Sequence, residues 1–419
     1  MITPATPPAA ANDYDPSAMP VAAARRFIQS WLVPISDAAL CPLRDSLGRV
    51  LAENIVSPLN VPAHRNAAMD GWAIRHRDIS TPHQTFTEIG TSFAGKPFTN
   101  DVRAGECVRI FTGAVIPETC DSVVMQERVT RNAHVITLNE DVVQGQHVRE
   151  VGEDLREGAI ALLAGKQIHP AELGLMASIG IGEVRVYRPL RVAYFSTGDE
   201  LVQIGQPLVA GQLYDSNRYT LHGMLTRMGI EAIDLGVAAD DPVELKKILI
   251  HAASTADVVI TTGGVSVGEA DYIKPILAEL GQVVFWKIAM KPGRPLAYGK
   301  IGIAHFFGLP GNPVSVMVTF YQFVRLALMT LQGVSPLPAE PLFNAVCTTA
   351  IKKIPGRTEF QRGILTFDGD DWCVRTTGAQ GSGILNSMSQ ANCFIVLDDN
   401  ADNVDAGTTV KVQLLEGII

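Results

Sequence analysis

The sequence has 419 residues, which is enough for roughly two to four domains, each with a hydrophobic core of its own. Hydrophobic residues make up 47% of the chain and charged residues 18%, as in ordinary globular proteins. The formal net charge of −9 argues against a nucleic-acid-binding protein, because non-specific binding to nucleic acid needs a basic surface.

The composition also indicates where the protein resides. Its six cysteines are scattered without a Cys-x-x-Cys pair, which predicts neither structural zinc nor a disulfide framework and fits a reducing compartment. Residues 1–18 are rich in proline and alanine and lack the features of a secretory signal, so we expect a disordered tail there. No stretch approaches the roughly 20 apolar residues of a membrane span. We therefore expect a cytoplasmic protein without membrane or nucleic-acid partners.

The first half of the chain has two helical patterns around a β-rich region. Apolar residues at helical spacing predict helices at Pro20–Leu32 and Pro170–Ile179. Between them, residues 57–153 show short apolar runs broken by Gly, Pro, Asn and Asp, which predicts a β-rich domain. We expect the flanking segments 19–56 and 154–187 to pack against each other.

From residue 188 to residue 334, strand and helix patterns alternate. This alternation predicts βαβ units and a mostly parallel sheet, with ligands bound at the carboxyl ends of the strands. A proline-rich linker follows, and short strand patterns in residues 335–419 predict a small β-barrel or sandwich. The predicted α/β elements are strands at Arg191–Ser196, Glu231–Leu235, Asp257–Thr262, Val283–Ile288 and Ala304–Phe307, and helices at Asn217–Met228, Tyr272–Leu280, after the Asp241–Pro242 cap, and from Val314.

A glycine-rich loop lies between the third of these strands and a helix. It contains Gly263, Gly264, Ser266, Gly268 and Asp271. Glycines at this place let the backbone approach a phosphate, and the N–H groups at the helix start face that anion. The closing aspartate would repel a bare phosphate, so the loop suggests a phosphate ester bridged by Mg²⁺. A simple tight turn between strand and helix is the alternative explanation.

A second loop of the same type precedes the last helix of the α/β region. It contains Pro310, Gly311, Asn312, Pro313 and Ser315, with Pro313 at the helix start and Asn312 as a possible cap. Because both loops follow strands of one sheet, they are expected at the same edge of that sheet, where the second loop could also approach a phosphate. A rigid Pro/Gly turn is the alternative.

A basic segment and an acidic turn complete the candidates. Lys287, Lys291 and Arg294 lie in a segment stiffened by Pro and Gly, which suits the binding of a small oxyanion, although a solvated charged loop would look the same. In the β-rich region, Asp70–Gly71 reads on its own as an ordinary turn.

Together these segments resemble the molybdopterin molybdenumtransferase family, which comprises the MoeA proteins and the gephyrin E domain. The resemblance extends from about Pro20 to the C-terminus. The motifs that carry it are AMDGWA (68–73), RIFTGAVIP (109–117), GED (152–154), STGDEL (196–201), YDSN (214–217), GGVSVGEADY (263–272), FWKIAMKPGRP (285–295), GLPGNPVS (308–315), PGRTEFQRG (355–363) and GAQGSG (378–383).

The resemblance implies a multidomain fold of the α/β plus β class. It consists of an elongated helical region at 19–56 and 154–187, a β-rich insert at 57–153, a central molybdopterin-binding α/β domain at 188–334 with a mostly parallel sheet, and a C-terminal β-barrel at 335–419. It also implies a homodimer with the active site between the subunits. Molybdopterin adenylyltransferase and molybdoenzyme acceptors are the further partners to consider.

The implied reaction inserts molybdate into adenylylated molybdopterin and releases AMP, with Mg²⁺ as the cofactor. Molybdate is a tetrahedral dianion, for which lysines, an arginine and a hydroxyl are chemically suitable ligands. The residues implied are Asp271 and Asp240 for metal and phosphate with Glu200 nearby, Asp70, Thr112 and Asp154 from the β-rich side, and Lys287, Lys291, Arg362 and Ser382 for molybdate.

Three positions depart from the family pattern. Ala67 stands where serine is frequent, Trp72 where tyrosine is common, and Arg294 where lysine is frequent. Two alternative functions also remain open. A molybdopterin adenylyltransferase shares the α/β domain but lacks the β domains, and a gephyrin-like scaffold would bind peptides without catalysis.

Overall fold

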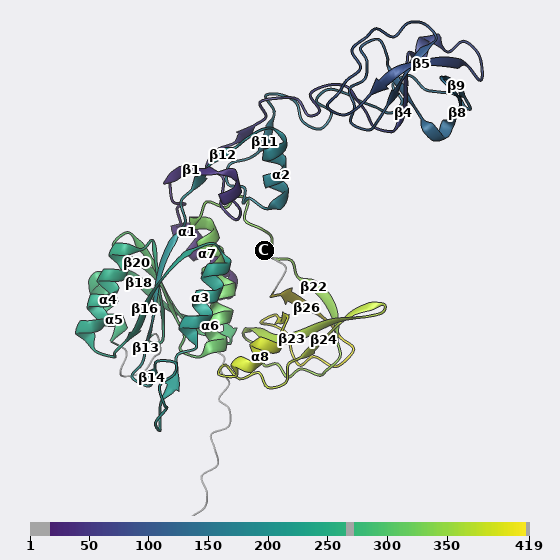
Figure 1. Ribbon diagram of the computed structural model, residues 1–419. Coiled ribbons are helices and arrows are strands. Elements are labelled where there is room, and N and C mark those ends of the chain that lie inside the picture. The colour runs from purple at the N-terminus through teal and green to yellow at the C-terminus, as the bar shows by residue number, and fades with distance from the viewer. Residues whose placement is uncertain (1–16, 265–271, 416–419) are drawn as a thin grey trace, which may run out of the picture.

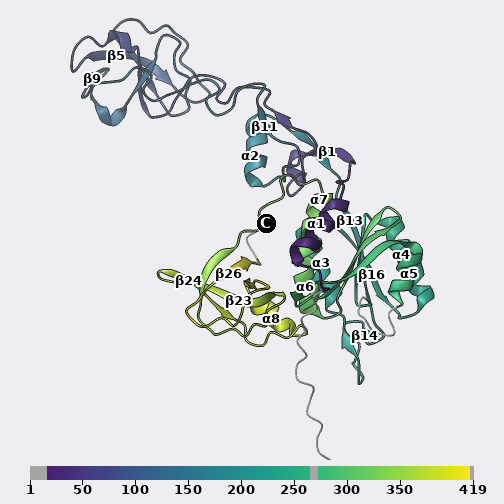
Figure 2. The same cartoon turned by 180° about the vertical axis from the view of Figure 1, so that it is seen from behind.

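The computed structural model describes residues 17–264 and 272–415. The chain is elongated, with the β-rich domain at one end and the α/β domain at the other (Figure 1). A small waist of strands and one helix joins these two parts, and the C-terminal barrel lies beside the α/β domain (Figure 2). The expected multidomain architecture of the α/β plus β class is confirmed.

The α/β domain is built on one six-stranded sheet. Only β20 runs against the other strands, so the expected mostly parallel sheet is confirmed. Five of the strands match predicted ones within a few residues, whereas β20 is additional. In spatial order the strands are β16 (Glu231–Ala238), β13 (Arg191–Thr197), β17 (Val258–Thr262), β21 (Ala304–Leu309), β20 (Pro295–Ile301) and β18 (Gly281–Lys287).

Helices cover both faces of this sheet. One face packs against α3, α6 and α7, which contribute buried residues such as Leu221 and Leu328 to the same core. The other face packs against α4 and α5 through Leu249 and Leu277. Asp241 caps α4 as expected, because its carboxylate accepts the N–H groups of the first turn. The helices are α3 (Asn217–Arg227), α4 (Pro242–Thr255), α5 (Ile273–Leu280), α6 (Pro313–Thr319), a π-helical turn (Phe320–Val324) and α7 (Arg325–Leu331).

The composite helix Pro313–Leu331 is, within the described residues, long and apolar enough to cross a membrane by length and composition. This differs from the expectation that no segment is. Inside the protein 78% of the apolar stretch is buried, so packing in the α/β core accounts for its hydropathy.

The first helix, α1 (Val21–Trp31), packs on the α/β domain, where Ala24 and Ile28 join the core of that domain. The waist is formed by the two segments that flank the β-rich domain, and these segments pair through short strands. Much of this region is strand rather than helix, which the sequence pattern did not reveal. Its elements are β1 (Ala38–Pro42), β12 (Glu183–Tyr187), β2 (Ile55–Val56), β11 (Ile160–Leu162) and α2 (Pro170–Ser178).

The β-rich domain contains a six-stranded sheet and a short two-stranded one. Alternating apolar residues such as Val108 and Ile110 face its core. The six strands in spatial order are β7 (Ser122–Met125), β4 (Gly71–Ile74), β6 (Glu106–Ile110), β5 (Thr85–Ser92), β9 (Val135–Leu138) and β8 (Val129–Asn132), and β3 (Asn66–Ala67) pairs with β10 (Val148–Arg149).

The C-terminal domain is a closed barrel, because β23 pairs with both β24 and β25. A strand from the α/β domain, β19 (Met290–Lys291), adds to β23 in parallel and ties the two domains together. The barrel strands are β22 (Phe343–Cys347), β23 (Thr358–Asp368), β24 (Asp371–Thr376), β25 (Cys393–Leu397) and β26 (Thr409–Leu414), with helix α8 (Leu385–Gln390) inserted before β25.

Candidate active site

The carboxyl ends of β13, β17 and β21 meet at one edge of the α/β sheet and border a cleft of about 710 Å³. This is the edge at which parallel α/β sheets bind ligands. Seven of the predicted site residues line this cleft: Glu200, Asp240, Gly263, Gly264, Gly311, Asn312 and Pro313.

Close backbone packing explains the two glycines of the first loop. Gly263 has a φ of +84°, and a Cβ there would lie 2.7 Å from the carbonyl oxygen of Thr197. Gly264 has a φ of +64°, and its Cβ would collide with Ile273. Both positions therefore require glycine, and the backbone is left uncovered toward the cleft. Ser266, Gly268 and Asp271 lie outside the described residues.

Three carboxylates gather on one side of the cleft. The backbone N–H of Asp240 donates to Oδ1 of Asp199 over 3.2 Å. Partial burial, together with the charges of Asp199 and Glu200, raises the pKa of Asp240. The excess negative charge would favour a bound cation.

The expected Mg²⁺ would have to bind at this carboxylate group. Within residues 17–264 and 272–415, no group of three or more His, Cys, Asp or Glu side chains has a metal-holding arrangement. Mg²⁺ is normally held by one or two carboxylates, water and substrate phosphates rather than by a complete protein cage. Asp240 and its neighbours fit that mode of binding.

The start of α6 forms the opposite wall. Pro313 occupies the first turn and Asn312 the N-cap position, but the Asn312 side chain makes no capping hydrogen bond. The Nδ2 group of Asn217 donates to the carbonyl of Gly311 over 2.7 Å and fixes the loop. Ser315 is 4% exposed and lies inside the helix, away from the lining of the cleft.

Two polar side chains that had not been assigned a role also line the cleft. Among the residues that the structure describes, the buried Oδ1 of Asn217 and Oδ2 of Asp215 lack a hydrogen-bond partner, although Oδ2 of Asp215 lies 3.8 Å from the Arg218 guanidinium. Buried polar atoms without partners are costly, so a polar ligand would satisfy them. Both belong to the YDSN motif, which is the sequence feature that could have identified them as site residues.

The C-terminal barrel closes one side of the cleft. The carbonyl of Ser382 accepts the N–H of Val314 at the start of α6 over 3.1 Å, and Gly383 and Leu385 line the cleft. Arg362 lies beneath this loop and is 1% exposed. It donates from Nε to Oγ of Ser387 and from Nη2 to the carbonyl of Gly381, each over 3.0 Å, and burial lowers its pKa to about 10.

The two predicted lysines lie at the same sheet edge but outside the described lining of the cleft. Lys287 ends β18 and is exposed. Nζ of Lys291 lies 3.7 Å from Oε1 of Glu359, a carboxylate that is itself buried against Arg357. The pairing of β19 with β23 places the basic segment beside the barrel.

The predicted residues of the β-rich domain are remote from this cleft within one chain (Figures 1 and 2). Oδ1 of Asp70 accepts the N–H and the hydroxyl of Thr112, each over 2.8 Å, and these bonds lower the pKa of Asp70. Asp154 is exposed at the junction with the waist. One chain therefore does not bring these three residues to Asp240.

The departures at Ala67 and Trp72 are buried in this domain. Ala67 is fully buried, and Trp72 is 2% exposed with its Nε1 donating to Glu88 over 2.9 Å. Both side chains therefore contribute to the core rather than to the exposed surface.

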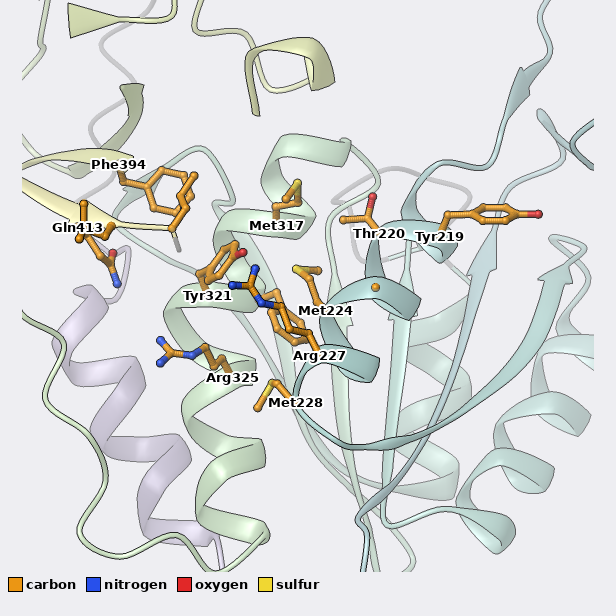
Figure 3. Close-up of a pocket in the computed structure, with 14 residues that line it drawn as sticks. Tyr219, Thr220, Met224, Arg227, Met228, Met317, Tyr321, Arg325, Phe394 and Gln413 are labelled. Atoms are coloured by element: carbon orange, nitrogen blue, oxygen red, sulfur yellow. The ribbon is translucent and has the colours of Figure 1, made fainter. Parts of the chain in front are cut away.

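A second cavity, of about 270 Å³, lies between α3, the α6–α7 helix and the barrel (Figure 3). Its walls are largely apolar, with Met224, Met317 and Phe394 facing it and Arg227 and Arg325 at its side. None of the predicted site residues that fall within the described ranges lines it. It lies away from the carboxyl ends of the strands and from the two glycine-containing loops, so the cleft at the strand ends is the candidate site.

Three family models match successive parts of the chain. They are the MoeA N-terminal region at residues 19–180, a probable molybdopterin binding domain at 193–330 and the MoeA C-terminal region at 344–415. A molybdopterin molybdenumtransferase from Haemophilus influenzae is 47% identical over 88% of this chain and 92% of its own length. The chain belongs to the MoeA family.

Further relatives agree with this assignment. A molybdopterin molybdenumtransferase from Nostoc is 35% identical over 90% of this chain and 89% of its own length. A crystal structure of a molybdopterin biosynthesis MoeA protein from Pyrococcus horikoshii aligns with a TM-score of 0.82 and 29% identity, covering 95% of this chain and all of that one. The cleft lies almost wholly inside the segment that matches the model of a probable molybdopterin binding domain, with Gly383 and Leu385 added from the barrel.

Proposed function

We propose that this protein is a molybdopterin molybdenumtransferase, which inserts molybdate into adenylylated molybdopterin and releases AMP in the last step of molybdenum cofactor biosynthesis. The observation that carries the proposal is the position of the cleft. It lies at the strand ends of the segment that matches a molybdopterin-binding domain, in a chain that matches MoeA proteins on both sides of that segment.

The phosphate-bearing part of the substrate is assigned to the glycine loop and the start of α6. Uncovered backbone at Gly263 and Gly264 faces the cleft from one side. The first turn of α6, after Asn312, faces it from the other and is favourable for an anion. Asp240 and Asp271 would hold Mg²⁺ between the acidic wall and the phosphates. When bound, Mg²⁺ supplies charge neutralisation as the phosphoanhydride breaks.

Molybdate is assigned to the cationic side of the same edge, where Lys287, Lys291, Arg362 and Ser382 are the candidates. A water oxygen attacks the adenylate phosphorus and the phosphoanhydride bond breaks. The molybdopterin phosphate is the leaving group, and AMP is released with the oxygen of the attacking water. Positioning of the substrates in and beside the cleft would provide most of the rate enhancement in such a transfer.

We further propose that the active site is shared between two copies of the chain in a cytoplasmic homodimer. Asp70 and Thr112 belong to the β-rich domain, which lies at the far end of the molecule from the cleft of its own chain, and Asp154 lies at the junction of that domain with the waist. A two-fold arrangement would bring them from the partner copy. Molybdopterin adenylyltransferase and molybdoenzyme acceptors are the proteins expected to supply the substrate and receive the product.

The direct test supplies purified protein with adenylylated molybdopterin, Mg²⁺ and increasing molybdate and measures AMP release. AMP release that depends on molybdate is expected. Its absence at every molybdate concentration contradicts the proposal.

Two alternative functions are distinguished by separate assays. Rapid adenylylation of molybdopterin with ATP alone would indicate an adenylyltransferase. The matches outside the α/β domain favour the transferase, since a free-standing adenylyltransferase lacks these regions. Peptide binding without any turnover would indicate a scaffold.

A further inference from the structure

A stack of aromatic and cationic side chains lies on the β-rich domain. The guanidinium carbon of Arg109 is 4.3 Å from the ring centroid of Trp72 and 5.4 Å from that of Phe111. The Phe111 ring stacks on Phe93 with centroids 5.0 Å apart and planes inclined by 8°. The contacts therefore run from Trp72 through Arg109 and Phe111 to Phe93.

The strand pairing of the domain holds this stack in place. Trp72 and Arg109 are cross-strand partners in β4 and β6. Phe111 directly follows β6, and Phe93 directly follows β5, its neighbour in the sheet. Trp72 and Arg109 therefore lie within paired strands, and each phenylalanine directly follows the end of a strand, so strand pairing restricts how far the side chains of the stack can move apart.

One end of the stack is buried and the other is open. Trp72 is 2% exposed, whereas Phe93 is 49% exposed. An aromatic ring that its neighbour already holds in a parallel orientation loses little further entropy when another ring stacks on it. Phe93 therefore presents a preorganised apolar face to a planar ligand.

The Asp70–Thr112 corner adjoins this face, because Thr112 is the residue after Phe111. Both hydrogen bonds from Thr112 end on Oδ1 of Asp70, which leaves Oδ2 able to accept from a ligand. An ionised carboxylate only accepts hydrogen bonds, and the paired hydroxyls of a ribose are suitable donors. Arg109 adds a positive charge beside the rings.

We propose that Phe93, Phe111 and Arg109 form the subsite for the adenine ring of the adenylylated substrate, with Asp70 accepting from the ribose hydroxyls. This inference rests on the proposed function. The cleft lies in the segment that matches a probable molybdopterin-binding domain, so the pterin half of the substrate is assigned there. The adenosine half then supplies the remaining planar ring, and in the homodimer proposed above it would stack on Phe93 of the second copy.

The test measures AMP binding to the full chain by calorimetry. Phe93→Ala is compared with Phe93→Trp, which keeps an aromatic face, and with Phe343→Ala, which removes a similarly exposed ring (43%) from the barrel. Loss of one base-stacking partner weakens binding by about tenfold. We expect a tenfold higher Kd for AMP in Phe93→Ala, near wild-type values in the other two variants, and a higher KM for adenylylated molybdopterin with little change in kcat.

Other outcomes overturn the subsite. The first is that the wild type does not bind AMP, and the second is that Phe93→Ala binds AMP as tightly as the wild type. The third is that Phe93→Ala binds molybdopterin without its adenylate more weakly than the wild type does, which would mean that Phe93 stacks on the pterin. AMP binding needs no turnover, so the two proposals fail separately. If the wild type shows molybdate-dependent turnover and Phe93→Ala keeps its AMP affinity, the subsite alone is contradicted. If the wild type shows no molybdate-dependent turnover, the proposed function is contradicted.

Discussion

At the scale of single residues, the candidate site depends on a glycine in a crowded backbone and on a carboxylate close to other negative charges. Gly263 combines a left-handed backbone with contact to the Thr197 carbonyl. Asp240 carries its charge beside Asp199 and Glu200. Each feature opposes stability of the empty protein, and each is explained by a ligand that needs uncovered backbone and a cation.

Gly263→Ala should lose both stability and substrate binding. The left-handed backbone and the clash with Thr197 together cost about 1–3 kcal/mol of unfolding free energy. Gly302→Ala is the control, because Gly302 has a φ of +59° but open space around its Cβ. Denaturant unfolding and substrate titration measure both effects. Equal losses of stability in the two variants would show that the close approach at Gly263 is unimportant.

Asp240→Asn should make the protein more stable and less active. A raised carboxyl pKa means that the charged form is disfavoured in the folded state, so stability falls as pH rises from the ordinary value of 3.8 through the folded pKa. Below pH 3.8 the wild type and Asp240→Asn should melt alike. At neutral pH the variant should melt roughly 1–3 °C higher, while AMP release falls roughly 100-fold.

Melting curves across this pH range, with AMP release at neutral pH, check that prediction. Asp101→Asn, an exposed carboxylate on the β-rich domain, is the control. A lower melting temperature of Asp240→Asn at neutral pH would contradict the repulsion that we infer from Asp199 and Glu200.

At the scale of elements, the loops after β17 and β21 could be predicted from sequence because glycine and proline directly follow apolar strand patterns. Other elements could not. The strand β20 follows the stiff segment Pro292–Pro295 and contains Gly299, which weakens a strand pattern. The structure explains this glycine, since a Cβ there would collide with the carbonyl of Gln282 on the neighbouring strand.

The burial of Arg362 could also not be predicted from the sequence. Its cation suggested a molybdate ligand, but tertiary packing of the barrel places it under the loop that borders the cleft, bonded to Gly381 and Ser387. A pattern of charges along the chain carries no information on such long-range contacts.

Arg362→Lys should keep the charge but lose the paired hydrogen bonds to Gly381 and Ser387, because lysine lacks the planar fork. We expect about a tenfold higher molybdate requirement for AMP release and faster amide exchange in residues 380–387. Arg375→Lys, on the exposed side of β24, is the control. Unchanged exchange and an unchanged molybdate requirement would remove Arg362 from the site.

At the scale of the whole molecule, the order and class of the domains agree with the sequence prediction, whereas their domain boundaries remain predictions. The spatial separation is the new information. Asp70 and Thr112 lie on the β-rich domain, and Asp240 lies on the α/β domain at the opposite end of the molecule. Sequence motifs placed these residues in one reaction but contained nothing on the distance between them. The proposed single active site with all of these residues therefore depends on the proposed second copy of the chain.

The most direct measurement purifies mixed dimers of Asp70→Asn and Asp240→Asn chains through two different affinity tags and follows molybdate-dependent AMP release. Each parental homodimer should be inactive. The mixed dimer carries one site with both wild-type carboxylates, so it should regain about half of the wild-type rate. A mixed dimer as inactive as its parents would contradict a transferase site built from the cleft of one chain and the β-rich domain of the other.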